Sequence, residues 1–253
     1  MNSEPNDILL TENNRSIAYV KHYHSKPRST RGIIFLSGFR SDMNGTKALF
    51  LEKWCLNQKY NFIKFDYSGH GKSSGEFESG SITDWCDDAK AVLDKLTTGP
   101  QILVGSSMGG WIALLLGKLR PERIAAFVGI AAAPDFTENS IWTNLNKEDQ
   151  SKLKNEGKIE LENHYSAEPY IVTEKLITDG RRNQIMNKKL EAPYAVRLLQ
   201  GMQDNDVHFS TASKLSEHIS HNNVVVTLVK EAEHQFSSPN CLKILKSTIE
   251  EFL

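Results

Sequence analysis

An apolar run, a glycine-flanked serine and a second apolar run follow one another without interruption over residues 101–119. The first run, residues 101–104, suits a buried strand, and the second, residues 111–119, suits a buried helix. Between them stands Gly105-Ser106-Ser107-Met108-Gly109. Glycine on both sides of Ser107 lets the chain turn sharply where a Cβ would strike a neighbouring element. The sequence therefore predicts a strand–turn–helix unit that exposes the Ser107 hydroxyl.

Strand and helix patterns alternate along most of the chain. Strands are expected at residues 7–10, 17–23, 32–36, 61–65, 101–104, 124–131, 192–199 and 224–229. Apolar residues recur with helical spacing over 46–56 and 82–96. Strands that alternate with helices pair in parallel and bury both faces of the sheet. The sequence therefore predicts an α/β fold, with a mostly parallel eight-stranded sheet covered by helices on both faces.

The alternation is interrupted between about residues 134 and 189, where helix signals appear and no strand is expected. An insertion after a strand, on the side where that strand ends, would cover the exposed serine. We expect a single domain over residues 1–253, with a core of 1–134 and 192–253 and a helical cap over about 135–191. The alternative is a helical appendage that does not contact a ligand.

Composition excludes several classes of protein. The formal net charge is −1, which gives no general attraction to nucleic acid or to an anionic membrane. The three cysteines, Cys55, Cys86 and Cys241, form no C-x-x-C pair, so a zinc ribbon is not expected. No apolar run reaches about 18 residues, and the N-terminus lacks a basic or long apolar leader. We expect a cytoplasmic protein without a nucleic-acid partner or an integral membrane segment.

The exposed serine has candidate catalytic partners farther along the chain. A serine hydroxyl becomes a good nucleophile when a histidine takes its proton and a carboxylate holds that histidine in the right tautomer. His234 lies in the loop after the strand at 224–229, just before the final helix. Asp204 follows the strand at 192–199. The order Ser107, Asp204, His234 is the order that a strand–turn–helix nucleophile requires.

Two other carboxylates could serve as the acid. Asp206 lies two residues after Asp204 and would reach the histidine if the turn were shifted. Asp135 follows the strand at 124–131, another strand end where an acid can stand. The position of Asp204, at the first step off its strand, favours it over both.

No metal or nucleotide cofactor is expected. His218 and His221 are one helical turn apart, but no third ligand accompanies them. Gly71-Lys72-Ser73 resembles the end of a phosphate-binding loop, yet Asp66 stands where that motif requires glycine. The elbow glycines do not form G-x-G-x-x-G. His70, in a glycine-flanked turn, is expected to be structural.

Attack by Ser107 on a carbonyl would place negative charge on the carbonyl oxygen, so two preorganised N–H donors are expected. One should be the backbone N–H of Met108, the residue after the nucleophile. The other should be the backbone N–H of Phe39, beside Gly38 in the loop after the strand at 32–36.

Four segments of the chain carry a family resemblance. They are FRSDMNGTKA at 39–48, FDYSG at 65–69, GPQILVGSSMGGW at 99–111 and GMQD at 201–204. Together they resemble the α/β-hydrolase-domain protein ten group, whose eukaryotic members are mitochondrial acyl-protein thioesterases that also hydrolyse acyl glucuronides. The MNGTKA and GPQILVGSS stretches are typical of that group, and the resemblance spans nearly the whole chain.

The resemblance implies the α/β-hydrolase fold and a serine hydrolase that cleaves carboxylic esters or thioesters through an acyl-serine intermediate. It implies Ser107 as nucleophile, Asp204 as acid and His234 as base. The substrate would be a small-molecule ester or an S-acylated protein. Side chains expected to line the substrate site are Arg40, Trp142 and Tyr170.

The chain departs from common hydrolase patterns at two positions: Ser37 replaces a frequent histidine, and His208 replaces a frequent proline. These departures, and the cap, leave the acyl and leaving groups open. The alternatives are a serine peptidase or lipase-type hydrolase, or a catalytically silent binding protein on the same fold. The mitochondrial matrix is the alternative location, if the chain is a mature eukaryotic form.

Overall fold

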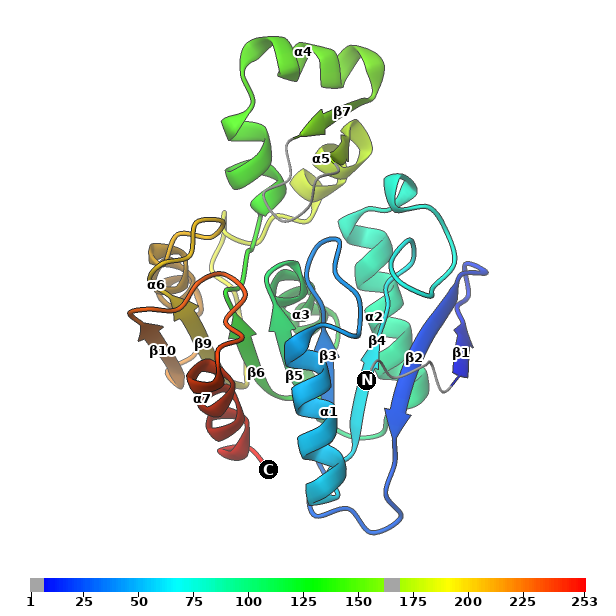
Figure 1. Ribbon diagram of the computed structural model, residues 1–253, viewed down its shortest axis with the longest axis vertical. Helices are drawn as coiled ribbons and strands as arrows, with labels where there is room; N and C mark the ends of the chain where they lie inside the picture. Colours follow the sequence, from blue (N-terminus) through cyan, green and yellow to red (C-terminus); the bar gives the residue numbers. More distant parts are fainter. Residues whose placement is uncertain (1–6, 162–168) are drawn as a thin grey trace.

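The computed structural model describes residues 7–161 and 169–253 (Figure 1). Its main sheet has eight strands in the order β1-β2-β4-β3-β5-β6-β9-β10. Their bounds are β1 Asp7–Leu10, β2 Ser16–His22, β3 Ile33–Leu36, β4 Phe62–Phe65, β5 Gln101–Ser106, β6 Ile124–Ile130, β9 Ala195–Gly201 and β10 Val224–Val229. Only β2 runs antiparallel to its neighbours β1 and β4, and the other pairings are parallel. The predicted fold class is therefore confirmed.

Helices cover both faces of the sheet. They are α1 Thr46–Gln58, α2 Ile82–Leu96, α3 Met108–Leu119, α6 Ser210–His218 and α7 Pro239–Glu250. Helices α1 and α7 bury Leu51 and Leu245 against one face. Helices α2, α3 and α6 cover the other face, where Trp85 and Trp111 are among the largest fully buried side chains. Two apolar layers therefore fix the sheet between the helices.

The predicted boundaries differ from the structure mainly at β9. A strand was expected from residue 192, but β9 begins at Ala195. Pro193 has no backbone N–H to donate to a neighbouring strand, so regular pairing begins after it. The strand at 224–229 and the helix at 82–96 have the expected bounds.

The parallel strands bring their carboxyl ends to one edge of the sheet. The last register pairs are Leu36 with Gly105, Ser106 with Ile130, Ile130 with Leu199, and Gly201 with Val229. The loops that follow β3, β5, β6, β9 and β10 therefore leave the sheet at nearly the same level. Residues distant in sequence meet there for that reason.

The insertion between β6 and β9 forms a cap at one end of the molecule (Figure 1). It contains α4 Lys147–Glu156 and α5 Glu174–Arg182, and short turns of π and 3-10 helix at Thr137–Ile141 and Trp142–Asn144. The prediction that this insertion holds no strand is wrong. Strands β7 Lys158–Leu161 and β8 Tyr170–Thr173 pair antiparallel within it. Residues 162–168 of the expected cap, like residues 1–6, lie outside the described part of the chain.

The two cap strands escaped prediction because each is a four-residue segment in a stretch rich in charged residues. Alternation over so few positions cannot be told from helical spacing in a charged stretch. Tertiary packing supplies the missing information, because Ile159 and Val172 are buried in a small cap core with Leu153 and Ile177. Across residues 7–161 and 169–253, no helix combines the length and apolar character needed to cross a membrane.

The turn between β5 and α3 tolerates only glycine at two positions. A Cβ on Gly109 would lie 2.1 Å from the Leu36 carbonyl oxygen, and one on Gly105 would lie 2.4 Å from the Gly109 carbonyl oxygen. Both contacts are with backbone, which cannot rotate away as a side chain can. Helix α3 therefore packs directly on the main chain of β3 and β5.

The Gly109→Ala variant should be destabilised by about 2 kcal/mol or more, because the added methyl forces α3 away from β3. Urea denaturation would measure the change in the free energy of unfolding. Gly45→Ala is the matched control, since the nearest atom to its added Cβ would be 3.8 Å away. Equal stabilities for the two variants would contradict this account of the turn.

Candidate functional site

Ser107 stands in a strained backbone conformation between β5 and α3. Its φ is 52° and its ψ is −118°, a region that costs free energy for a residue with a Cβ. Its backbone N–H donates to the Ile130 carbonyl at 2.9 Å, and its own carbonyl accepts from the Ala133 N–H at 3.1 Å. The end of β6 thus holds the strained turn in place, with the Ser107 side chain partly exposed at the carboxyl edge of the sheet.

His234 and Asp204 are hydrogen-bonded to each other. The distance from His234 Nδ1 to Asp204 Oδ2 is 2.9 Å. The Asp204 side chain is fully buried, and that of His234 is 18% exposed, so one member of the pair faces the protein and the other can reach solvent. The two loops are also joined by main chain, because the Gln203 N–H donates to the Ala232 carbonyl at 3.0 Å.

The structure places the other two candidate acids differently. Asp206 Oδ2 is 4.0 Å from His234 Nδ1, beyond hydrogen-bond distance. Asp135 is buried and accepts from the backbone N–H groups of Ile185, at 2.9 Å, and Met186, at 3.0 Å. Asp135 therefore ties the start of the cap to its end, and Asp204 is the carboxylate directly bonded to the histidine.

Asp204 is held in its charged form. Burial raises the pKa of its carboxyl. The hydrogen bond and charge of His234 and the backbone N–H groups of Val207 and Asp206 lower this pKa by more than burial raises it. The net pKa of Asp204 lies below its ordinary value. The carboxylate is therefore ionised at neutral pH and can stabilise a protonated imidazole.

Asp204, Asp206 and His234 are also close enough to be considered as metal ligands, since each offers a ligand atom within 4.8 Å of the others. Hydrogen bonds already occupy the Asp204 carboxylate. Its Oδ1 accepts the N–H groups of Asp206 and Val207, and its Oδ2 accepts His234 Nδ1. The hydrogen bond from His234 Nδ1 to the ionised Asp204 carboxylate explains why these two residues lie together.

The loop after β3 lies against Ser107. A Cβ on Gly38 would be 3.4 Å from Ser107 Cβ, and a hydrogen bond of 3.1 Å from Ser41 N–H to the Gly38 carbonyl closes the loop. Within residues 7–161 and 169–253, neither the Phe39 N–H nor the Met108 N–H has a hydrogen-bond acceptor. These are the two donors that the sequence predicts for a developing oxyanion.

His70 is hydrogen-bonded to the loop after β3. Its Nε2 accepts the Arg40 backbone N–H at 3.3 Å, and its Nδ1 is 3.1 Å from the Ser68 carbonyl, to which it donates. This pattern requires a neutral ring with the proton on Nδ1. Burial lowers the pKa of His70 to about 4, which keeps the ring neutral. These contacts are compatible with the structural role that the sequence predicts, and through Arg40 they brace the loop that carries Phe39.

Aromatic side chains form one wall beside Phe39. Its ring meets those of Phe77, Phe136 and Tyr170 edge to face, with centroid distances of 5.0, 5.3 and 6.3 Å. Phe136 and Tyr170 belong to the cap, so the cap contacts the predicted oxyanion loop. The Arg40 guanidinium lies 5.4 Å from the Phe77 ring centroid, and its side chain is exposed.

Trp142, the third predicted lining residue, has a different setting. Two cations lie near its ring centroid: the Arg181 guanidinium at 4.5 Å and the Lys154 ammonium at 5.2 Å. It packs on the small cap core. No ring contact joins it to Phe39 in the described part of the chain. Tyr170 and Arg40 therefore lie near Phe39 and Trp142 does not contact it, and a substrate-lining role for all three stays a prediction.

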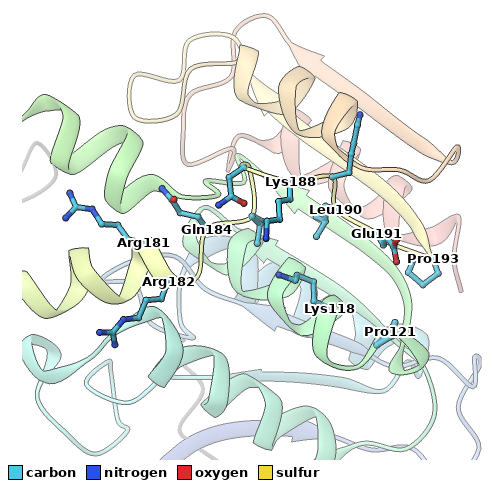
Figure 2. Close-up of a pocket in the computed structure, with 13 residues that line it drawn as sticks. Lys118, Pro121, Arg181, Arg182, Gln184, Lys188, Leu190, Glu191 and Pro193 are labelled. Carbon is cyan, nitrogen blue, oxygen red and sulfur yellow. The ribbon is translucent and has the colours of Figure 1, made fainter.

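A cavity of about 590 Å³ lies elsewhere, between the end of α3 and the chain that leaves the cap. Lys118, Arg182 and Lys188 are among its lining residues, and the serine, the acid and the histidine are not. Figure 2 shows Arg181 and Arg182 extending away from Lys118. We therefore do not place the reaction in this cavity.

Two contacts at the site were not foreseen. The Gln200 side-chain Nε2 donates to Asp204 Oδ2 at 2.8 Å. Lys47 Nζ donates to the Gln235 carbonyl, next to His234, and burial lowers the pKa of Lys47 to about 8. Lys47 lies in the quoted MNGTKA stretch, and Gln200 is a polar residue at the end of an apolar strand. Both signals were present in the sequence, but neither specifies a partner.

Comparison with known proteins places the chain among hydrolases. Residues 27–167 match the family model described as serine aminopeptidase, S33. The human mitochondrial palmitoyl-protein thioesterase ABHD10 is 34% identical over 239 residues, which cover 94% of this chain and 76% of that protein.

Two solved structures are similar over nearly their full lengths. Mouse α/β-hydrolase domain-containing protein 10 superposes with a TM-score of 0.87 and 31% identity, covering 97% of this chain and 96% of that one. A protein described as a hydrolase from Agrobacterium vitis S4 gives a TM-score of 0.91 and 39% identity, with the same coverage.

His70 should make the protein less stable in acid. The folded protein keeps the ring neutral down to about pH 4, whereas the unfolded chain takes up a proton near pH 6.5. The unfolded state therefore binds more protons between these values, and the free energy of unfolding should fall as the pH drops through this window. At about 1.4 kcal/mol per pKa unit the loss attributable to His70 is about 3 kcal/mol.

Urea denaturation from pH 7 to pH 4 would measure this loss. His70→Gln keeps an acceptor for the Arg40 N–H and cannot titrate, so its stability should fall less steeply with pH than that of the wild type. His208→Gln, an exposed control, should keep the wild-type slope. A wild-type slope in His70→Gln would show that His70 does not cause the acid sensitivity.

Proposed function

The chain belongs to the α/β-hydrolase family that includes the palmitoyl-protein thioesterase ABHD10, and on this basis we propose that it is a serine hydrolase of carboxylic esters or thioesters. The observation that carries the proposal is the Asp204–His234 hydrogen bond of 2.9 Å, formed at the same sheet edge as the strained Ser107. In this arrangement Ser107 is the nucleophile, His234 the base and Asp204 the acid.

The geometry supports a two-step reaction. In the first step, His234 Nε2 takes the Ser107 proton while Ser107 Oγ attacks the carbonyl carbon. Negative charge moves to the carbonyl oxygen, which accepts from the N–H groups of Phe39 and Met108. The tetrahedral intermediate then collapses, and the alcohol or thiol leaves with the proton from His234.

In the second step, His234 takes a proton from water, and the resulting nucleophile attacks the acyl-serine. Collapse of the second intermediate returns the proton to Ser107 and releases the carboxylic acid. No hydrogen bond joins Ser107 Oγ to His234 in the described structure. Catalytic hydrogen bonds of this kind often shorten only when substrate binds.

The surroundings of Ser107 favour an apolar acyl group. Phe39, Phe136 and Tyr170 are partly exposed, and the rings of Phe136 and Tyr170 pack on Phe39, in the loop whose Gly38 lies against Ser107. An acyl chain that covers them removes apolar surface from water. A small-molecule ester and an S-acylated protein both supply such a group, and Arg40, next to Phe39 in the chain, is exposed.

Peptide hydrolysis is the second candidate, because the matching family model is described as a serine aminopeptidase. A catalytically silent protein is disfavoured, since serine, histidine and acid are all present with acid and base paired. Relatives are named as mitochondrial, and a cytoplasmic or mitochondrial location stays a prediction for this chain.

Ser107→Ala should abolish both fluorophosphonate labelling and turnover. The assay is a panel of p-nitrophenyl esters and acyl-thioesters from acetyl to palmitoyl, with a peptide p-nitroanilide beside it. Ser106→Ala is the matched control, because it removes the neighbouring hydroxyl from the same turn. Turnover that peaks at one acyl length and disappears only in Ser107→Ala supports the proposal. Turnover that survives in Ser107→Ala refutes it, and faster anilide cleavage favours the peptidase.

Asp204→Asn should lower kcat by about 10⁴-fold, because an amide cannot stabilise the imidazolium and favours the wrong tautomer. Asp135→Asn keeps one of the two oxygens that accept from Ile185 and Met186 and does not touch the Asp204–His234 pair, so its kcat should stay within about tenfold of wild type. Asp206→Asn should behave in the same way. The assignment of the acid is wrong if either control loses as much activity as Asp204→Asn.

A further inference from the structure

Gln200 is a polar residue buried within an otherwise apolar strand end. It follows Leu198 and Leu199 in β9, lies opposite Leu228 of β10, and is 1% exposed. Its side-chain Nε2 has three acceptors within reach: Asp204 Oδ2 at 2.8 Å, the Val207 carbonyl at 3.1 Å and the Gly201 carbonyl at 3.3 Å.

These partners fix the orientation of the amide. All three are acceptors, so the NH₂ end must face them, because the opposite orientation would set Gln200 Oε1 against a carboxylate and two carbonyls. In the chosen orientation Oε1 is buried and has no hydrogen-bond partner in the described structure. A buried polar atom without a partner is unfavourable. Any favourable contribution of the Gln200 amide therefore comes from the hydrogen bonds of its NH₂ group.

The NH₂ group completes the set of donors around Asp204. Oδ1 accepts the backbone N–H groups of Asp206 at 2.9 Å and Val207 at 2.8 Å. Oδ2 accepts His234 Nδ1 at 2.9 Å and Gln200 Nε2 at 2.8 Å. Each oxygen thus has two donors, and Gln200 is the one that holds Oδ2 from the protein side. Its bond to the Val207 carbonyl also fixes the base of the Asp204 loop.

We propose that Gln200 is a positioning residue for the reaction, which holds Asp204 Oδ2 at His234 Nδ1 and so keeps the imidazole in the tautomer whose Nε2 can accept the Ser107 proton. The proposal rests on the proposed function above. Gln200 does not contact substrate. It acts through Asp204, in the way that outer partners orient the residues that react.

The first test is Gln200→Met, which keeps the length and apolar stem of the side chain and removes the donor. We expect kcat to fall about 10- to 100-fold, part of the roughly 10²–10⁴ that acid–base catalysis supplies, with KM unchanged. Gln101→Met is the matched control. Gln101 is a buried glutamine at the start of β5, at the edge of the sheet opposite Ser107. Its side chain donates to the Thr98 and Gly99 carbonyls.

A purely structural role for Gln200 would give a different pattern. Both methionine variants would then lose thermal stability, and the kcat and KM of soluble, folded enzyme would stay at wild-type values in both. Equal kcat values in Gln200→Met and Gln101→Met overturn the proposal.

The second test is Gln200→Glu, which remains informative if the methionine variant fails to fold. A glutamate here would place a second carboxyl beside Asp204 Oδ2, where two like charges cannot both ionise easily. The pair would keep a proton to higher pH, and activity that needs ionised Asp204 would be lost as the pH falls through this raised value. The groups facing the pair are His234 and Asp206.

We expect the acid limb of the kcat/KM profile of Gln200→Glu to move upward by about one pH unit or more. Gln101→Glu should keep the wild-type profile, and a wild-type profile in Gln200→Glu would overturn the proposal. The activity of Ser107→Ala separates failure of the Gln200 proposal from failure of the proposed function. If Ser107→Ala is inactive while both Gln200 variants match wild type, only the role of Gln200 fails. If Ser107→Ala is active, the proposed function itself fails.

Discussion

Direct backbone contact between α3 and the strands β3 and β5 is the constraint on which the rest of this structure depends. It requires glycine at 105 and 109, since a Cβ at either position would overlap main-chain atoms. The close approach forces Ser107 into a left-handed φ, and hydrogen bonds from the end of β6 hold it there. Strain at this residue is therefore balanced by packing in three neighbouring strands and a helix, and it leaves the hydroxyl exposed at the sheet edge.

Parallel pairing converts that local turn into a site. Strands β3, β5, β9 and β10 end at one level, so the loops with Phe39, Ser107, Asp204 and His234 converge although they span most of the sequence. Buried polar groups then set the orientation of each part. His70 braces the loop of Phe39, and Gln200 and two backbone N–H groups surround the carboxylate of Asp204. Hydrogen-bond donors and charged groups that stabilise a developing charge must be held rigidly in place, and these contacts provide that support.

The cap joins the core through contacts of two kinds. Asp135 accepts backbone N–H groups from Ile185 and Met186, so one carboxylate fastens the entry and exit of the insertion. Phe136 and Tyr170 pack on Phe39, so the cap also touches the loop that lies against Ser107. A change in the cap can therefore reach the loop beside Ser107 by a direct aromatic contact.

Features that depend on neighbouring residues in the chain could be predicted from the sequence alone. The glycine-flanked Ser107, the alternation of strands and helices, and the order of Ser107, Asp204 and His234 follow from short-range sterics and hydrophobic spacing. These patterns gave the fold class and the residues that the structure brings to one edge. The start of β9 was missed by three residues because Pro193 removes a donor from an otherwise apolar run.

Only the tertiary structure decided which carboxylate bonds to His234, since Asp204 and Asp206 differ by two positions in one loop and the direction of each side chain depends on the register of β9 with β10. It also decided the role of Asp135, the cap ribbon of β7 and β8, and the contact of Gln200 with Asp204. Each of these depends on partners that are distant in sequence or on strands of four residues, and local periodicity carries no information about such partners.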